Sequence, residues 1–316
     1  MTDGWSVSAV VPTYRRPELV VRAVRSVLAQ TIAAREAIVV VDDRDAATIA
    51  ALEAIGDARV RVVVPERHLG NAEARNAGIR AAAGVWIALL DDDDCWLATK
   101  LERQLGTAKA MPHRFPIVSC RVIARGARRD FHWPRRLPQP DEPMSEYLFC
   151  RRRPGSGDGL IQTSTVLAPR ALFAEVPFRS GQRYVDQDWL LRACRIAGVG
   201  IAFAAADEPL VVWHMEHERE RISNRDDWRW AIAWIEARRD LVTPRAYAAF
   251  LLTLASASAV RQGDRAAFRV LLREAWLHGR PGAVETVNHL ANFLLPPGLQ
   301  HGLASLGASM RRRSST

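Results

Sequence analysis

Four consecutive aspartates, Asp91 to Asp94, directly follow an apolar run of six residues, 85–90. The run has the length and composition of a strand buried on both faces. Four negative charges at the tip of a buried strand repel one another, so they require a compensating cation. Proteins hold Mg²⁺ and Mn²⁺ with one or two carboxylates together with phosphate oxygens of a substrate. The run therefore predicts a divalent-metal site here rather than a solvated acidic turn.

The elements that must position these acids alternate between strand and helix. Apolar β-type runs at 6–11, 37–41, 60–64 and 85–90 alternate with helical patterns beginning at Pro17, at 46 and at 70. Such alternation predicts βαβ units and a parallel sheet, in which ligands bind beyond the carboxyl ends of the strands. Asp42 and Asp43, which follow the second run, should therefore lie near the four aspartates.

Beyond Asp94 the alternation loosens, and the last quarter of the chain is helical. We expect helices over 97–110, 169–176 and 186–197, strands over 117–123, 160–167, 201–204 and 210–213, and loops over 125–143 and 151–159. A helical bundle is expected over 227–241, 244–262, 264–278 and 281–295. The tail, 298–310, places Leu299, Leu303, Leu306 and Met310 on one helical face beside three arginines, so it could lie in a membrane interface or dock on the protein.

The bulk composition is that of an ordinary soluble globular protein, with 48% hydrophobic and 25% charged residues among 316. No apolar run approaches the roughly 18 to 20 residues that span a bilayer. No secretory signal precedes the first strand, and the four cysteines are far apart, so we expect a cytoplasmic protein with reduced thiols. The net charge of +9 favours anionic partners: nucleic acid, a membrane face or a phosphorylated substrate.

Several motifs, taken together and in order, resemble those of family 2 glycosyltransferases. They are Val10-Val11-Pro12-Thr13-Tyr14, Val39-Val40-Val41-Asp42-Asp43, Ala74-Arg75-Asn76-Ala77-Gly78, Leu90-Asp91-Asp92-Asp93-Asp94-Cys95-Trp96, Lys100-Leu101-Glu102 and Asp186-Gln187-Asp188-Trp189. The resemblance implies an α/β GT-A fold, with a mostly parallel sheet flanked by helices. It implies a glycosyltransferase domain over 1–225, with a donor half at 1–112 and an acceptor half at 113–225. The helical region 226–316 lies outside it.

The resemblance also implies a binding site for a nucleotide-sugar donor. Tyr14 can stack on a base, Asp43 can accept from a uracil N–H, and Arg75 can pair with the diphosphate or hold the acidic strand ends. Asp93 would ligate Mg²⁺ or Mn²⁺, with Asp91 and His214 as further candidate ligands. The donor-binding set is completed by Pro12, Thr13, Asn76, Asp91 and Asp92. Arg15 stands where the family often has Asn, and the sequence offers no account of that change.

An inverting transfer further needs one carboxylate to accept the proton of the acceptor hydroxyl. The resemblance points to Asp186, but the family usually has an acidic pair there and this chain has Val185 before it. Asp188 therefore remains the second candidate, and either acid could instead begin a helix. By position, Gln162, Thr163 and Trp189 are expected on the acceptor side.

The expected function is metal-dependent inverting transfer from a nucleotide-sugar, a UDP-sugar by preference, to a hydroxyl in surface polysaccharide assembly. The acceptor could be a lipid-pyrophosphate-linked saccharide at the cytoplasmic membrane face, a protein or a small molecule. A sugar-nucleotide pyrophosphorylase is disfavoured because no Gly-rich loop follows the first strand. A nucleic-acid-binding protein, which would gain nothing from clustered acids, and a non-catalytic scaffold of the same fold are the alternatives of another class.

Overall fold

The computed structural model describes residues 3–126, 130–153, 157–181, 183–215 and 227–295. The chain divides into two compact units. One comprises Met1–Leu137 and Ile161–Arg219, and the other comprises Pro138–Leu160 and Glu220–Thr316. Residues 138–160, expected in the acceptor half, therefore group with the C-terminal helices.

The first unit is built on a sheet of nine strands, counted over the described residues, in the order β3-β2-β1-β4-β8-β6-β9-β5 with β7 beside β6. Four parallel strands form one half of this sheet: β1 (Val7–Thr13), β2 (Glu36–Val41), β3 (Val60–Val63) and β4 (Trp86–Leu89). All six residues of β2 are buried, and all but Glu36 are apolar, as expected of a strand covered on both faces. The predicted βαβ arrangement is confirmed.

The second half of the sheet is mixed. It contains β5 (Cys95–Trp96), β6 (Phe115–Arg125), β7 (Asp130–Trp133), β8 (Leu167–Pro169) and β9 (Val199–His214). The long pairing of β6 with β9 is parallel, whereas β8 pairs antiparallel with both β4 and β6 over short stretches. The sheet is therefore mostly parallel by length of pairing, as predicted.

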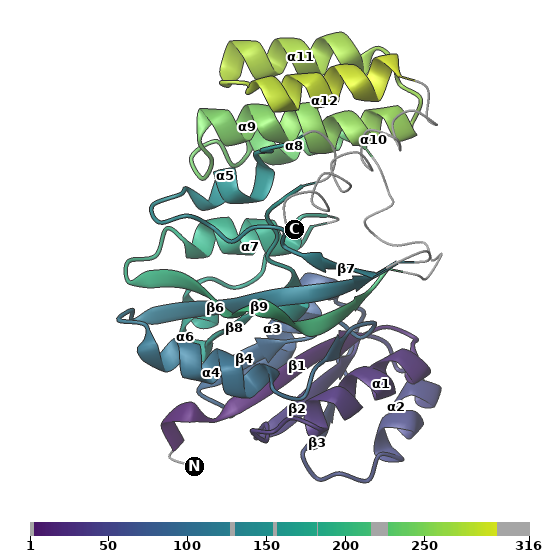
Figure 1. The fold of residues 1–316 in the computed structure, drawn as a ribbon. Helices are drawn as coiled ribbons and strands as arrows, with labels where there is room; N and C mark the ends of the chain where they lie inside the picture. Colours follow the sequence, from purple (N-terminus) through teal and green to yellow (C-terminus); the bar gives the residue numbers. More distant parts are fainter. Residues whose placement is uncertain (1–2, 127–129, 154–156, 182, 216–226, 296–316) are drawn as a thin grey trace. The chain divides into compact units, whose positions relative to one another are not determined.

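Helices flank this sheet (Figure 1). The first, α1, begins at a proline with Glu18 in its first turn and buries Val20, Ala23, Val24 and Val27, as the helical spacing predicts. The α-helices of this unit are α1 (Pro17–Leu28), α2 (Ala46–Glu53), α3 (Asn71–Ala81), α4 (Lys100–Ala110), α6 (Arg170–Glu175) and α7 (Val185–Ala193). Short 3-10 turns form η1 (Asp3–Trp5) and η2 (Thr163–Thr165).

Three local predictions were wrong. The two strands expected at 201–204 and 210–213 are one strand, β9, which continues through an exposed stretch at 206–208. The strand expected at 160–167 is instead η2 followed by the three residues of β8, because the Gln162 side chain accepts from the Ser164 N–H and closes a turn. The expected loop at 125–143 contains β7, which pairs with β6.

The second unit is helical, as predicted. Its helices are α5 (Met144–Phe149), α8 (Trp228–Glu236), α9 (Pro244–Phe250), the π-helical η4 (Leu251–Ala255), α10 (Ser256–Arg261), α11 (Ala267–His278) and α12 (Ala283–Leu294). Stacked and edge-on aromatic rings of Phe149, Trp234 and Phe250 form part of its core. No helix in the described part of the chain is long and apolar enough to cross a membrane. The tail 298–316 lies outside the described residues.

Close packing of α3 on the parallel strands generates the first testable prediction. A Cβ on Gly78 would lie 2.5 Å from Val10 Cγ1 and 3.1 Å from Val40 Cγ2, so Gly78→Ala should overpack this contact and destabilise the fold by about 1–3 kcal/mol. Gly106, in α4, has no atom within 4 Å of its Cβ position apart from its chain neighbours and the backbone of its own helix, so Gly106→Ala should stabilise by roughly 0.5–1 kcal/mol. Urea unfolding of both variants measures this, and equal effects would contradict the packing argument.

Candidate active site

The four aspartates follow β4 at the same edge of the sheet as the end of β1, but they do not share one environment. Asp92 points into the protein, where Thr13 Oγ1 donates to it at 2.8 Å and Arg16 Nη1 at 2.9 Å. Burial raises its pKa to about 6, against the opposing effect of the Arg16 charge. Asp92, expected to bind donor, therefore ties the acidic turn to the end of β1.

Asp94 is fully buried and joins three separate segments. Its carboxylate accepts from Ser164 Oγ at 2.6 Å, from Gln162 Nε2 at 2.7 Å and from the His214 N–H at 3.3 Å. Burial, with the negative charges of Asp91 and Asp93, raises the pKa of this carboxyl well above its ordinary value. Asp94 thereby fixes the turn after β4 to η2 and to the end of β9.

Asp91 and Asp93 keep their side chains half-exposed, at 27% and 30%. Asp91 pairs with Arg75 Nη2 at 2.7 Å, and its N–H donates to Ser164 Oγ at 3.0 Å. Asp93 lies 3.6 Å from Arg16 Nη1, and its carbonyl accepts from Arg22 Nη2 at 2.6 Å. Of the four carboxylates, these two are therefore accessible to a ligand.

The side chains at the acidic turn supply only part of the coordination shell of a divalent metal. Within the described residues, no group of three or more His, Cys, Asp or Glu side chains is arranged to hold a metal ion. Asp91, Asp93 and His214 consequently do not form a complete set of metal ligands. His214 is buried, and its backbone N–H donates to Asp94. Half-exposed carboxylates suit Mg²⁺ or Mn²⁺, which take one or two of them and complete their shells with phosphate and water oxygens.

A second cluster lies at the ends of β1 and β2. The exposed ring of Tyr14 lies 4.9 Å from the His68 ring, and Arg15 Nε donates to Asp43 Oδ2 at 2.7 Å. That hydrogen bond and charge lower the pKa of Asp43. Pro12 lies in β1, paired with Val40 of β2. The structure therefore gives Arg15 a partner that sequence reasoning missed.

Asp42 has a different role from its neighbour. It is buried, and its carboxylate accepts from the N–H groups of Leu69 at 2.6 Å and Gly70 at 2.7 Å. The backbone of Gly70 has a φ of 76°, in the left-handed region that glycine adopts without strain. Asp42 therefore holds the turn that leads into α3.

Arg75 and Asn76 of α3 point in different directions. Arg75 is 2% exposed and lies between Asp91 and Thr163 Oγ1, the latter at 3.4 Å. Its Nε and Nη1 are buried and have no hydrogen-bond partner in the described part of the chain. Asn76, in contrast, exchanges two hydrogen bonds with the backbone of Phe178, at 2.8 and 3.0 Å. Arg75 thus faces the acidic turn, whereas Asn76 holds the segment after α6.

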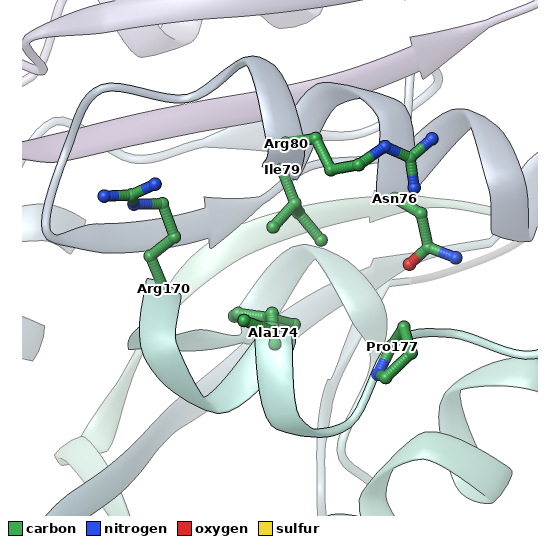
Figure 2. Close-up of a pocket in the computed structure, with 7 residues that line it drawn as sticks. Asn76, Ile79, Arg80, Arg170, Ala174 and Pro177 are labelled. Carbon is green, nitrogen blue, oxygen red and sulfur yellow. The ribbon is translucent and has the colours of Figure 1, made fainter.

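A hollow of about 390 Å³ lies between α3 and α6, on the Asn76 side (Figure 2). Its lining combines the arginines Arg80 and Arg170 with the apolar side chains of Ile79, Phe173, Ala174 and Pro177. None of the four aspartates lines it, so this hollow is separate from the acidic turn.

Asp186 stands in the first turn of α7, half-buried, beside a cavity of about 10 Å³ that Thr163 also lines. Burial raises its pKa, and the charge of Arg75 and a hydrogen bond from Thr163 oppose that rise. Asp188 is buried and pairs with Arg192 Nε at 2.8 Å on the same helix. The structure thus brings Asp186 within the electrostatic reach of Arg75 and Asp91.

The residues expected on the acceptor side separate into two groups. Gln162 and Thr163 reach the acidic turn, through Asp94 and Arg75 respectively. Trp189 does not: it is 1% exposed, its ring stacks on Phe173 and Phe178, and its Nε1 donates to the Val176 carbonyl. Trp189 is therefore a core residue that lines the same cavity of about 10 Å³ as Thr163 and Asp186, and its place on the acceptor side stays a prediction.

Lys100 and Gln104 of α4 form buried hydrogen bonds that reach the backbone of η2. Lys100 Nζ donates to Gln104 Oε1 at 2.6 Å and lies 4.0 Å from the centroid of the Trp96 ring. Gln104 Nε2 in turn donates to the carbonyls of Val118 and Thr165, both at 2.7 Å. Burial lowers the pKa of Lys100 to about 8. These buried bonds fix the backbone that presents Gln162, Thr163 and Ser164.

Comparison with known proteins places this geometry in context. Residues 8–173, just over half of the chain, match the family model described as Glycosyl transferase family 2. The amylovoran biosynthesis glycosyltransferase AmsB of Erwinia amylovora is 28% identical over 77% of this chain and 82% of its own length.

Two further similarities are more limited in extent or in identity. The Escherichia coli UDP-Glc:alpha-D-GlcNAc-diphosphoundecaprenol beta-1,3-glucosyltransferase WfgD is 37% identical over 33% of this chain, and the match spans 41% of that protein. A crystal structure of Staphylococcus aureus TarS 1-349 aligns with a TM-score of 0.51 at 16% identity, covering 86% of this chain and 91% of that one. This last likeness supports the fold alone.

The position of Ser164 generates a test of the buried network. Its hydroxyl donates to Asp94 and accepts from the Asp91 N–H, so Ser164→Ala should leave both groups without that partner and destabilise the fold by about 2–3 kcal/mol. Urea unfolding measures the loss. Thr107→Ala is the matched control, since its exposed hydroxyl bonds only the Arg103 carbonyl within α4. A change in Ser164→Ala no larger than that of the control would show that the network is not needed.

Proposed function

Because the chain belongs to glycosyl transferase family 2, we propose that this glycosyltransferase performs a metal-dependent, inverting transfer from a UDP-sugar to a saccharide hydroxyl. The observation that carries the proposal is the pairing of Asp91 with the buried cation of Arg75 near the half-buried Asp186, with the accessible carboxylate of Asp93 on the same turn. A donor that presents a diphosphate next to an anomeric carbon is complementary to this arrangement.

The donor's base is assigned to the cluster of Tyr14 and Asp43, where an exposed ring and a carboxylate both contact Arg15. Asp43 can accept from a uracil N–H when its Oδ2 oxygen is shared with the Arg15 donor or when Arg15 moves away from it. The name of the relative WfgD specifies UDP-Glc, which supports UDP as the nucleotide here.

The diphosphate is assigned to the neighbourhood of Arg75. Arg75 is 2% exposed, and two of its guanidinium nitrogens have no protein partner among the described residues. Burial of donors without partners costs folding free energy, and an anion that accepts their hydrogen bonds would remove that cost. Asp93, with Asp91, would hold Mg²⁺ or Mn²⁺ against that diphosphate. When bound, the metal ion supplies positive charge that stabilises the departing nucleoside diphosphate.

Asp186 is assigned as the general base. The acceptor hydroxyl oxygen forms a bond to the anomeric carbon as the bond from that carbon to the diphosphate oxygen breaks, and the carboxylate of Asp186 takes the hydroxyl proton. Its first-turn position beside Thr163, close enough to be influenced by Arg75 and Asp91, supports this assignment. Asp188 is the weaker candidate because its carboxylate is buried against Arg192.

The acceptor is proposed to be a lipid-pyrophosphate-linked saccharide used in surface polysaccharide assembly at the cytoplasmic face of the membrane. The relatives named for amylovoran biosynthesis and for transfer to GlcNAc-diphosphoundecaprenol support this class. Protein and small-molecule acceptors are the alternatives that an acceptor screen would distinguish.

Replacement of the proposed metal ligand tests the donor assignment. Asp93→Ala should lower Mn²⁺-dependent turnover of UDP-sugar by at least about 10² because charge on the leaving diphosphate is no longer stabilised. It should also remove the Mn²⁺-dependent part of UDP binding, measured by calorimetry. Glu53→Gln, an exposed carboxylate at the end of α2, is the control and should leave both unchanged. Full metal-dependent turnover in Asp93→Ala would refute the assignment.

Paired amide substitutions test the base. Asp186→Asn should keep UDP binding but lose roughly 10² to 10⁴ of the transfer rate, because the amide cannot accept the proton. Since the pKa of Asp186 is raised, wild-type transfer should fall on acidification at a pH above the ordinary aspartate value. Asp188→Asn removes the pair with Arg192 and should reduce stability while leaving transfer nearly intact. If Asp188→Asn abolished transfer and Asp186→Asn did not, Asp188 would be the general base.

A further inference from the structure

The outer face of the helical hairpin α11–α12 exposes an unusual amount of apolar surface. Six of the nine exposed large apolar residues in the described part of the chain lie on these two helices. Trp276 is 63% exposed, and Leu294 is 68% exposed. The six residues, here called the hairpin surface, are Val270, Trp276, Leu277, Val287, Leu290 and Leu294.

Both helices present these residues on the same side of the hairpin. Helical spacing puts Val270, Trp276 and Leu277 on the face of α11 opposite its buried Leu271. Val287, Leu290 and Leu294 likewise form one stripe of α12, opposite its buried residues. Since α11 and α12 both pack on η4 and lie beside each other, the two stripes face away from one shared helical layer (Figure 1).

The charges on this face have one sign. Arg269 and Arg273 are exposed on the same side of α11 as Trp276, and Arg280 follows the helix. The only acids between 265 and 295 are Glu274, which lies 3.4 Å from His278, and Glu285, which is 1% exposed. Exposed arginines therefore lie beside the apolar hairpin surface.

This combination selects among occupants. A second copy of the chain docked through the same face would bring like charges together, which opposes a self-complementary interface. An anionic lipid surface instead accepts tryptophan and leucine side chains at the headgroup level and attracts the arginines. The sequence continues beyond Leu295 into further leucines and the basic Arg311-Arg312-Arg313.

We propose that the hairpin surface docks the protein on an anionic phospholipid membrane. The proposal deepens and rests on the proposed function, because a lipid-linked acceptor is presented at such a membrane. The arginines supply the electrostatic attraction, and the apolar side chains enter the headgroup region.

Vesicle co-sedimentation of the full chain tests the docking. Wild type should partition onto phosphatidylcholine vesicles that contain phosphatidylglycerol, more weakly at high salt, and poorly onto phosphatidylcholine alone. Arg269→Ala with Arg273→Ala should weaken partition by about thirtyfold, since each basic residue near an anionic surface contributes on the order of 1 kcal/mol. Trp276→Ser with Leu277→Ser should weaken it comparably.

Matched controls come from the sheet unit. Val64→Ser and Val85→Ser remove exposed apolar side chains, and Arg103→Ala removes an exposed arginine of α4, so all three should partition like wild type. Thermal melts establish that each variant is folded.

Two outcomes would overturn the proposal. One is equal partition of wild type and the hairpin variants, including no partition by either. The other is a shift from dimer to monomer in the variant that combines Trp276→Ser with Leu277→Ser, with unchanged partition, which would identify a second copy as the occupant. Because UDP-sugar hydrolysis in vesicle-free buffer is measured separately, failure of the proposed enzyme activity remains distinguishable from failure of membrane docking.

Discussion

A single buried carboxylate, that of Asp94, connects the parts of the site. It accepts hydrogen bonds from Gln162 and Ser164 of the η2 segment and from the backbone of His214 at the end of β9, two segments that lie far from the acidic turn in the sequence. A fully buried carboxyl group is costly unless its hydrogen bonds are satisfied, so these bonds fix η2 and the end of β9 relative to the acidic turn. The orientation of Asp91 and Asp93 toward the open side follows from the inward anchoring of their neighbours Asp92 and Asp94.

The acidic run thus divides into two structural and two accessible carboxylates in alternation. The four residues form a turn in which the Asp94 N–H donates to the Asp91 carbonyl at 3.1 Å, and the partners of each side chain fix its direction. Asp92 and Asp94 face the protein, where Thr13, Arg16 and Ser164 meet them, and Asp91 and Asp93 face outward. The spacing of two accessible acids with one residue between them therefore follows from the inward anchoring of Asp92 and Asp94 within this turn.

The sequence predicted the βαβ core well, because apolar periodicity and strand-end acids are local signals. It did not predict η2, where a side-chain cap at Gln162 replaces a strand, nor the continuity of β9 through exposed residues. The sequence also did not predict the partners of several side chains. No local signal shows that Asn76 bonds the backbone of Phe178, that Arg15 pairs with Asp43, or that Trp189 packs in the core. The basic pair directly after β1 was the available signal for Arg15 and Arg16, since cations beside strand-end acids tend to pair with them.

The Asp94 junction also constrains how such an enzyme can diversify. New acceptor preferences are commonly acquired by exchanging surface loops, but residues 162–164 cannot be exchanged as a passive loop, because they complete the hydrogen bonds of a buried carboxylate. A chimera that takes the segment containing η2 from a relative would have to carry a matching serine and glutamine with it. Recombination breakpoints that keep η2 together with the turn after β4 should therefore be the ones that yield folded hybrids.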